Sequence, residues 1–432
     1  MKVYSLGGYE EVGRNMTALE VKNKVLILDL GIRLDRVMIG EDTNIQNMST
    51  KELDRLGAVP DITPLKGKEI VGIVISHGHL DHIGAISRFV GKFKCPVVGR
   101  PYPLRLLSSM LKEETTPVKC PMFEMHDSSI VIGDFEISMI PVTHSIPQSS
   151  FVIINTCEGN VVFTGDYKLD NHQELQRPIS FSKLKKLDPK LLIIDSTNVI
   201  QEGITPSEKV AKTLLTDYLK MIEDSRNGIV ATTFSSQIER VFTIINQAEK
   251  MGRKPVLLGK SLCKYYGLAL EMGLVKKNVQ MIRKREAINA YLKDVNNNKK
   301  DYLVLTTGSQ GEKEAVLSRM VDDKTPYKFE NRDSVIFSAS VIPNPLNKAS
   351  RYTLETKLKM KNTSVVRDLH VSGHASKEEH RKIIRTLSPE IVMPCHGYPD
   401  MLISMADLCY EEGYDLNDQV IVQRNGQSFQ IG

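Results

Sequence analysis

The stretch His77-Gly78-His79-Leu80-Asp81-His82 decides how this chain is to be understood. It follows the apolar run Ile70–Ile75, which predicts a buried strand that ends at a turn. Four side chains able to bind a metal ion lie within these six residues, and core packing does not account for such a density of polar groups. Imidazole nitrogen and carboxylate oxygen suit Zn²⁺ at ~2.0–2.2 Å and also admit Mn²⁺ or iron.

Three further ligand candidates, His144, Asp166 and His396, each come directly after an apolar run. Each residue alone is more typical of a cap or a turn. Their repeated position is informative, because open sheets carry their sites at the carboxyl ends of strands. We therefore expect these side chains to join those of the first motif.

The full set can hold two ions, with Asp166 between them. One ion would be bound by His77, His79 and His144, and the other by Asp81, His82 and His396. Two ions ~3.5–4 Å apart can stabilise the attacking and the leaving oxygen of an in-line displacement at phosphorus. Asp29 ends the run Val25–Leu28 and is either an acid that orients a ligand histidine or an ordinary turn residue.

Composition excludes several classes of protein. The chain has 432 residues, 41% hydrophobic and 25% charged, which is ordinary for a globular protein of two or three domains. No apolar run approaches the ~18–20 residues of a membrane span. Six separate cysteines without a CxxC pair are typical of reduced thiols. We expect a soluble cytoplasmic protein without a membrane partner.

The pattern of elements indicates an inserted domain. Short strands dominate the first 200 residues or so, whereas strand and helix signals alternate after Pro206, as in parallel βαβ units. The region from Lys250 to Lys300 contains thirteen Lys or Arg and three acids, which suits either a polyanion-binding surface or solvated helix faces. A further strand is predicted at Val365–Val371. One layout that fits is a domain in two parts, 1–205 and 346–432, with an α/β domain at 206–345.

A turn in the inserted segment has the features of a phosphate-binding loop. Gly308, Ser309 and Gln310 precede a predicted helix at Lys313–Met320, and backbone N–H groups at such a turn attract anions. A plain strand–helix turn is the alternative. His126, His172 and His380 have no ligand neighbours in the sequence and are interpreted as surface or loop residues.

The motif set resembles that of the metallo-β-lactamase fold, an αββα sandwich with a dinuclear zinc site between its sheets. Asp195 in IIDSTN, His374 in HVSGHAS and His396 in PCHGY are similar to the three markers of the β-CASP branch of nucleases. Within that branch, LGGYEEVGRNM, TGDYKLD, DSTN, TTGSQGE and HVSGH are most similar to the ribonuclease J group in its archaeal form. The resemblance covers essentially the whole chain and implies an α/β fold with an inserted β-CASP domain.

The resemblance also implies roles for individual residues. His374 would act on the scissile phosphate as an acid catalyst, held by Asp195, and Asp81 would join them as a catalytic residue. The substrate-binding residues would be His370, Val371, Ser372, Gly373 and His374, together with Ser235, Arg240, Gly308, Ser309 and Gln310. Gln237 and Glu239 depart from the Asn and His usual in bacterial relatives.

The function implied is a metal-dependent ribonuclease. Its cofactors would be two Zn²⁺ per subunit, with Mn²⁺ or Mg²⁺ as alternatives that support activity, and its substrate single-stranded RNA. A 5′→3′ exoribonuclease that prefers 5′-monophosphate RNA, acting as a homodimer, is the first hypothesis. An endoribonuclease of the polyadenylation-factor type and an inactive RNA-binding scaffold are the alternatives.

Overall fold

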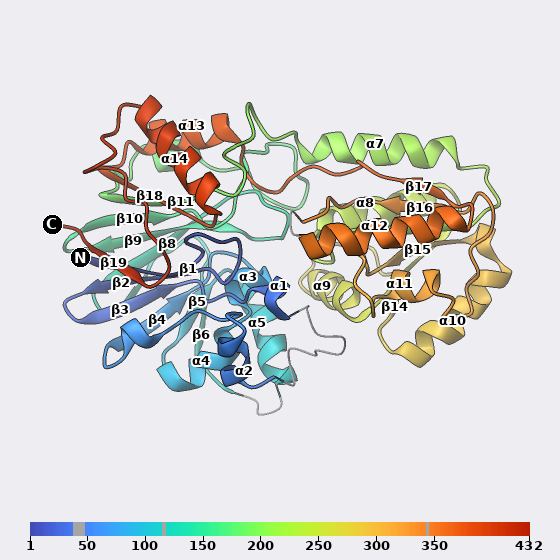
Figure 1. The fold of residues 1–432 in the computed structure, drawn as a ribbon, viewed down its shortest axis with the longest axis horizontal. Coiled ribbons are helices and arrows are strands. Elements are labelled where there is room, and N and C mark those ends of the chain that lie inside the picture. The colour runs from blue at the N-terminus through green and yellow to red at the C-terminus, as the bar shows by residue number, and fades with distance from the viewer. Residues whose placement is uncertain (38–47, 115–117, 343–344) are drawn as a thin grey trace. The chain divides into compact units, whose positions relative to one another are not determined.

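Three β-sheets organise the described part of the chain, and each carries helices (Figure 1). The computed structural model describes residues 1–37, 48–114, 118–342 and 345–432. Two compact units result. The first comprises residues 1–171, 176–205 and 373–432, and the second comprises residues 172–175 and 206–372. Among the described residues, no helix combines the length and apolarity needed to cross a membrane.

The first unit contains two sheets. The first sheet has the strand order β19 (Gln427–Gln430), β1 (Lys2–Gly7), β2 (Met16–Val21), β3 (Lys24–Leu28), β4 (Glu69–Val74), β5 (Val97–Gly99) and β6 (Met122–Glu124). The second has the order β18 (Ile391–Cys395), β11 (Leu191–Asp195), β10 (Gly159–Phe163), β9 (Ser150–Thr156), β8 (Phe135–Pro141) and β7 (Ile130–Ile132). The helices are α1 (Leu34–Val37), α2 (Thr50–Arg55), α3 (Leu80–Ile83), α4 (Ile86–Phe93), α5 (Pro101–Glu113), α6 (Phe181–Leu184), α13 (Lys377–Leu387) and α14 (Pro399–Glu411), with a 3-10 turn at Thr63–Leu65.

The continuous apolar run of β11 shows why this unit is layered. Leu191 and Ile193 face the core between the two sheets, whereas Leu192 and Ile194 face a second core under the helices. A strand with helices on one face and a sheet on the other needs apolar residues on both. Ile383 of α13 and Leu408 of α14 complete that second core, and both helices lie over the second sheet in Figure 1. This arrangement is the predicted αββα sandwich.

The second unit is built on a single parallel sheet. Its strand order is β14 (Gln280–Ile282), β13 (Lys254–Leu258), β15 (Tyr302–Thr306), β12 (Ile229–Thr232), β16 (Ser334–Phe337) and β17 (Ser364–Val366). Its helices are α7 (Glu208–Met221), α8 (Ile238–Lys250), α9 (Lys260–Glu271), α10 (Arg285–Asn297), α11 (Val316–Val321) and α12 (Pro345–Met360), with a 3-10 turn at Lys299–Asp301. The predicted α/β character of the inserted segment is confirmed.

Two boundaries differ from the sequence-based expectation. The second unit continues to Ser372 instead of residue 345, because β17 pairs with β16 and the α12 residues Leu354 and Leu358 fill the core of this unit. The strand predicted at Val365–Val371 ends at Val366. Beyond that point the carbonyl of Leu369 accepts hydrogen bonds from side chains instead of from a neighbouring strand.

Candidate metal centre

The loop after β4 places the first motif at the end of a strand, as predicted. His79 takes the N-cap position of α3, so Asp81 and His82 lie in the single turn of helix that follows. Gly78 allows the close packing of this loop, because a Cβ atom there would lie 2.8 Å from Leu106 Cδ1. A residue with a Cβ atom would require the Leu106 side chain of α5 to shift.

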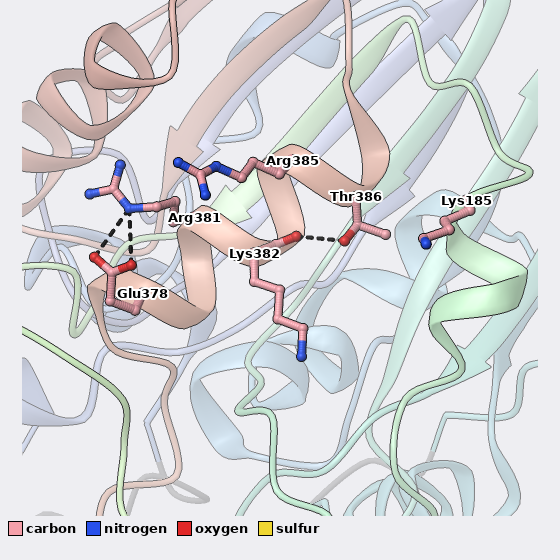
Figure 2. A pocket seen from close by; sticks show the side chains of 6 residues that line it. All are labelled: Lys185, Glu378, Arg381, Lys382, Arg385 and Thr386. Atoms are coloured by element: carbon pink, nitrogen blue, oxygen red, sulfur yellow. Dashed lines mark hydrogen bonds and ion pairs between the residues drawn. The ribbon is translucent and has the colours of Figure 1, made fainter.

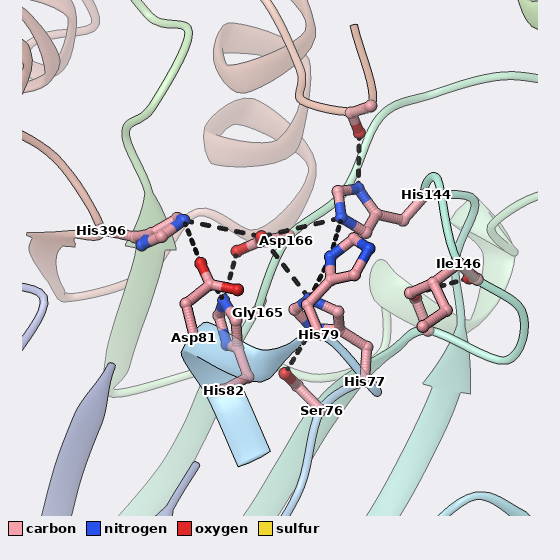
Figure 3. Close-up of polar contacts among 12 residues, drawn as sticks. Ser76, His77, His79, Asp81, His82, His144, Ile146, Gly165, Asp166 and His396 are labelled. Atoms are coloured by element: carbon pink, nitrogen blue, oxygen red, sulfur yellow. Dashed lines mark hydrogen bonds and ion pairs between the residues drawn. The ribbon is translucent and has the colours of Figure 1, made fainter. Parts of the chain in front are cut away.

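A first group of ligand atoms gathers His77, His79, His144 and Asp166 (Figure 3). These atoms all lie within 4.8 Å of one another. His79 Nδ1 is 3.2 Å from His77 Nε2 and 3.1 Å from His144 Nε2, so three ring nitrogens converge on one point. The three histidines come from two loops far apart in the sequence.

A second group contains Asp81, His82 and His396, and it shares Asp166 with the first. The Asp81 carboxylate lies 3.7 Å from the Nε2 atoms of both His82 and His396. Asp166 is almost fully buried, and its carboxylate lies within 3.8 Å of five imidazole nitrogens, those of His77, His82, His144, His374 and His396. Asp166 therefore occupies the position expected of a bridge.

Asp29 holds two of these rings from behind. Its Oδ2 atom lies 2.7 Å from His82 Nδ1 and accepts a hydrogen bond from Ser76 Oγ at 2.7 Å. Ser76 Oγ in turn is 3.0 Å from His77 Nδ1. An acceptor at Nδ1 places the proton there, which leaves the lone pair of Nε2 directed at the cluster.

Two further acceptors, which sequence reasoning did not assign this task, orient two more of the ligand rings. His144 Nδ1 lies 2.7 Å from the carbonyl oxygen of Gly373, and His396 Nδ1 lies 2.8 Å from Asn15 Oδ1. Asn15 is buried just before β2. A lone Asn ahead of a strand gives no signal of this role, because His396 is brought to it only by folding.

The protonation states of the first group suit metal ligands. Burial lowers the pKa of His77 and of His144 well below 6.5, and it lowers the pKa of His79 to about 4, so these rings are neutral near pH 7. Burial raises the pKa of Asp166, but the surrounding histidines outweigh this effect and hold it well below 3.8. Neutral imidazoles around an ionised carboxylate form a donor set that binds divalent cations.

The donor set also passes an electrostatic test for a cation. Burial lowers the pKa of His82, yet the carboxylates of Asp166, Asp81 and Asp29 raise it well above 6.5. The protonated His82 ring thus carries positive charge among three carboxylates, and a divalent cation bound at this ring would take the place of the proton. The ring nitrogens that face one another in the first group cannot all donate, so a shared cation accounts for their convergence.

His374 and Asp195 form an adjoining pair. His374 Nδ1 is 2.9 Å from Asp195 Oδ2, and His374 Nε2 is 3.8 Å from Asp166 Oδ2. Burial lowers the pKa of His374, but Asp195 and Asp166 outweigh burial and raise it to about 9. The Thr197 N–H fixes Asp195 by donating to its Oδ1 at 2.9 Å. The pair thus presents a protonated imidazole beside the cluster.

The structure distributes the predicted substrate-binding residues unevenly. Gly373 and His374 lie in the first unit, whereas His370, Val371 and Ser372 end the second. Ser235, half-buried after β12, is 3.0 Å from Ser261 Oγ. The buried Gly308, Ser309 and Gln310 do not lead directly into a helix, since α11 begins at Val316. Gln310 is already hydrogen-bonded to the backbone of Ser340 and Ile342.

Two interpretations from the sequence require correction. Arg240 is 0% exposed and its guanidinium is bound to Glu208, so it does not present a charge to RNA. His380 is buried in α13 rather than at the surface, and its Nδ1 lies 2.7 Å from the hydroxyl of Tyr167. Each side chain is buried against a polar partner distant in the sequence, which the local pattern does not reveal.

A separate hollow lies on the outer face of α13 (Figure 2). It is lined by Lys185, Glu378, Arg381, Lys382, Arg385 and Thr386. Glu378 accepts from Arg381 at 3.1 Å, and Glu412 pairs with both Arg381 and Arg385. The charges of these arginines are balanced by neighbouring glutamates. The residues that line the hollow also include no histidine and only one carboxylate, unlike the His–Asp cluster.

Three family models match the chain. Residues 9–196 match the metallo-beta-lactamase superfamily, residues 226–353 match "Ribonuclease J, beta-CASP domain", and residues 360–422 match "Zn-dependent metallo-hydrolase RNA specificity domain". The second model lies within the second unit, and the third crosses from that unit into the first. The matches thus cover both units.

Curated relatives extend over the whole chain. Ribonuclease J of Pyrococcus abyssi is 47% identical and aligns with 100% of this chain and 97% of its own length. Ribonuclease J of Methanocaldococcus jannaschii is 42% identical, with 99% and 98% coverage. A crystal structure of a protein of unknown function from Enterococcus faecalis V583 shares the fold, with a TM-score of 0.68, 18% identity and 99% coverage of both chains.

Proposed function

The chain belongs to the ribonuclease J family, and on that premise we propose that it is a metal-dependent ribonuclease that degrades single-stranded RNA from the 5′ end. The single observation that carries the proposal is the convergence of seven ligand side chains on the two groups that share Asp166. An inactive scaffold does not need this set, because buried ionisable groups are costly unless they serve a site.

We assign the metal ligands as two sites for Zn²⁺, with Mn²⁺ or Mg²⁺ as alternatives. His77, His79 and His144 would hold one ion, Asp81, His82 and His396 would hold the other, and Asp166 would be shared by the two sites. When bound, the ions activate a water molecule and stabilise charge on the oxygens at phosphorus. Asp29 and Asn15 keep the ligand rings of His82 and His396 in the correct tautomer.

The protein's own acid catalyst is His374. With its pKa raised to about 9, the ring is protonated at neutral pH, and Asp195 fixes its orientation through Nδ1. Its Nε2 atom lies 3.8 Å from Asp166 Oδ2, where the N–H would act on the reacting phosphate as a charge stabiliser or as a proton donor to the leaving 3′-oxygen. Asp81 completes the catalytic set, and its side chain is 27% exposed whereas that of His82 is 1% exposed.

The preference for 5′-monophosphate RNA, the homodimer and the cytoplasmic location belong to the same proposal and rest on the family resemblance. An endonuclease of the polyadenylation-factor type is the competing activity. The two differ in the need for a free 5′ end, which makes them separable by substrate design.

The test compares 3′-labelled linear RNA carrying a 5′-monophosphate or a 5′-triphosphate with circular RNA. The expected result is mononucleotide release from the monophosphate RNA, which the variants His77→Ala and Asp166→Ala abolish. Cleavage of the circle would assign endonuclease activity instead. Activity that survives in both variants would refute the metal mechanism, and the mass of the purified protein by light scattering checks the dimer.

A further inference from the structure

Arg240 is a buried cation whose partners lie inside the second unit. It lies in the first turn of α8, and its side chain is fully buried. Nε and Nη2 each lie 2.7 Å from Glu208 Oε1, while Nη1 donates to Ser338 Oγ at 2.5 Å and to the carbonyl of Leu369 at 2.7 Å. One guanidinium thus joins α8, the start of α7, the end of β16 and the segment after β17.

The Leu369 carbonyl is the one backbone atom of this network that lies next to the predicted substrate segment. It accepts from Arg240 Nη1 at 2.7 Å and from Ser338 Oγ at 2.6 Å. Ser338 is itself fixed, since its N–H donates to the Thr232 carbonyl at 2.8 Å. A carbonyl that accepts from both a cation and a hydroxyl is held more firmly than a turn carbonyl exposed to water.

The segment from Leu369 to Gly373 is therefore fixed at both ends. At its far end the Gly373 carbonyl lies 2.7 Å from Nδ1 of His144, one of the candidate ligands. Only His370, Val371 and Ser372 separate the two anchored residues, and each spans at most ~3.3–3.6 Å. The anchor of Leu369 is a contact within the second unit, and the anchor of Gly373 is a contact within the first.

A second connection between the units, at Thr205 and Pro206, is held in the same manner. Glu208 is the first residue of α7, just after the chain enters the second unit at Pro206. In the first unit, Thr205 Oγ1 donates to the His374 carbonyl at 2.7 Å. The entering and the leaving segments are therefore tied together twice, by Thr205 in one unit and by the Glu208–Arg240 pair in the other.

We propose that the Glu208–Arg240 pair positions the segment from Leu369 to Gly373 for RNA and that neither side chain contacts RNA itself. The inference rests on the proposed function. Stability alone does not explain the pair, because replacing a buried ion pair by apolar residues is often neutral or stabilising. Arginine is required because only its planar fork bonds a carboxylate and a carbonyl at the same time, whereas lysine offers a single nitrogen.

The test uses the full-length protein with Arg240→Lys and the double substitution Glu208→Leu/Arg240→Met, which removes the pair without leaving a lone charge. Lys357→Met is the matched control, because Lys357 forms an ion pair with Asp322 at the same 2.7 Å but at the surface of the same unit. Thermal unfolding identifies folded variants. Steady-state kinetics on RNA and on bis(p-nitrophenyl) phosphate, and binding of fluorescein-labelled RNA, are then measured.

We expect KM for RNA, and Kd in the binding assay, to rise at least tenfold in both variants and less than twofold in the control. The fall in kcat/KM should be at least ten times larger for RNA than for the small diester, which needs no long substrate segment. Parallel losses on both substrates, or unchanged RNA affinity in folded Arg240→Lys, would overturn the proposal. If the wild-type protein binds RNA without cleaving it, the proposed function is refuted. The binding assay would then still show whether the Glu208–Arg240 pair affects RNA affinity.

Discussion

Replacing Asp29 by Asn tests whether the hydrogen bonds behind the histidines determine metal affinity. Asp29 is 0% exposed and accepts three hydrogen bonds, each 2.7 Å long, from Ser76 N, Ser76 Oγ and His82 Nδ1. Its φ of 56° lies in the left-handed region, which Asn tolerates better than most residues, so the backbone is preserved. The substitution changes only hydrogen bonding and charge.

The magnitude follows from the geometry. In Asp29→Asn, the remaining oxygen keeps the bond from Ser76 N, while an NH₂ group faces the Nδ1–H of His82. The lost charge-assisted hydrogen bond is worth about 1.5–3 kcal/mol. Because the NH₂ group and the Nδ1–H of His82 are both donors, their contact favours the opposite tautomer of His82. In that tautomer the proton is on Nε2, where the metal must bind. We expect metal affinity at the site containing His82 to fall about 10–100-fold.

The assay is metal content after equilibration against buffers of defined free Zn²⁺, read by mass spectrometry, together with the melting temperature of the metal-loaded protein. Asp134→Asn is the matched control, because Asp134 is a carboxylate of the same unit that pairs with Lys24 near the surface. Unchanged zinc affinity in folded Asp29→Asn would refute the argument that Asp29 sets the tautomer of His82.

Removing divalent metal with EDTA should abolish RNA cleavage and lower the melting temperature. Metal at 100 times its Kd adds about 2.7 kcal/mol per site to the free energy of unfolding. Recovery of cleavage and of the melting temperature on addition of Zn²⁺ alone checks this prediction. Asn15→Ala should weaken metal binding about 10–100-fold by freeing His396 Nδ1, measured by the same equilibration. His374→Gln should lower kcat by about 10²–10⁴ with metal content unchanged. Burial raises the pKa of Glu239 to about 7, although its Oε1 accepts from Glu174 N at 2.8 Å. The folded state therefore binds this proton more tightly than the unfolded state, and stability falls as pH rises from about 4.5 to 7. Glu239→Gln should raise the unfolding free energy by up to about 3 kcal/mol at pH 8 and leave it unchanged at pH 4, as urea titrations at both values would show.

Features that depend only on residues close together in the chain could be predicted from the sequence. The six residues from His77 to His82 form their motif without help from the rest of the fold, and the apolar runs before His144, Asp166 and His396 predicted strands that the structure contains. The αββα layering follows from the same runs, since a strand apolar on both faces must be covered twice. The likeness to known motifs added the link between Asp195 and His374.

Pairings across long stretches of sequence could not be read in this way. Asn15 and His396 are 381 residues apart, and only the closing of the first unit brings Asn15 Oδ1 to the ring. Periodicity assigns a side chain to a face of its element but does not identify what packs against that face.

Arg240 shows the same limit most clearly. A guanidinium at the start of a helix suits RNA contact and a buried ion pair equally well, and the outcome depends on whether Glu208 is within reach. The sequence by itself determined the ligand types, their order and the layers that present them. Only the tertiary structure decided which of these groups share a centre and which charges are neutralised inside, because the desolvation of a polar group is compensated by partners that folding alone supplies.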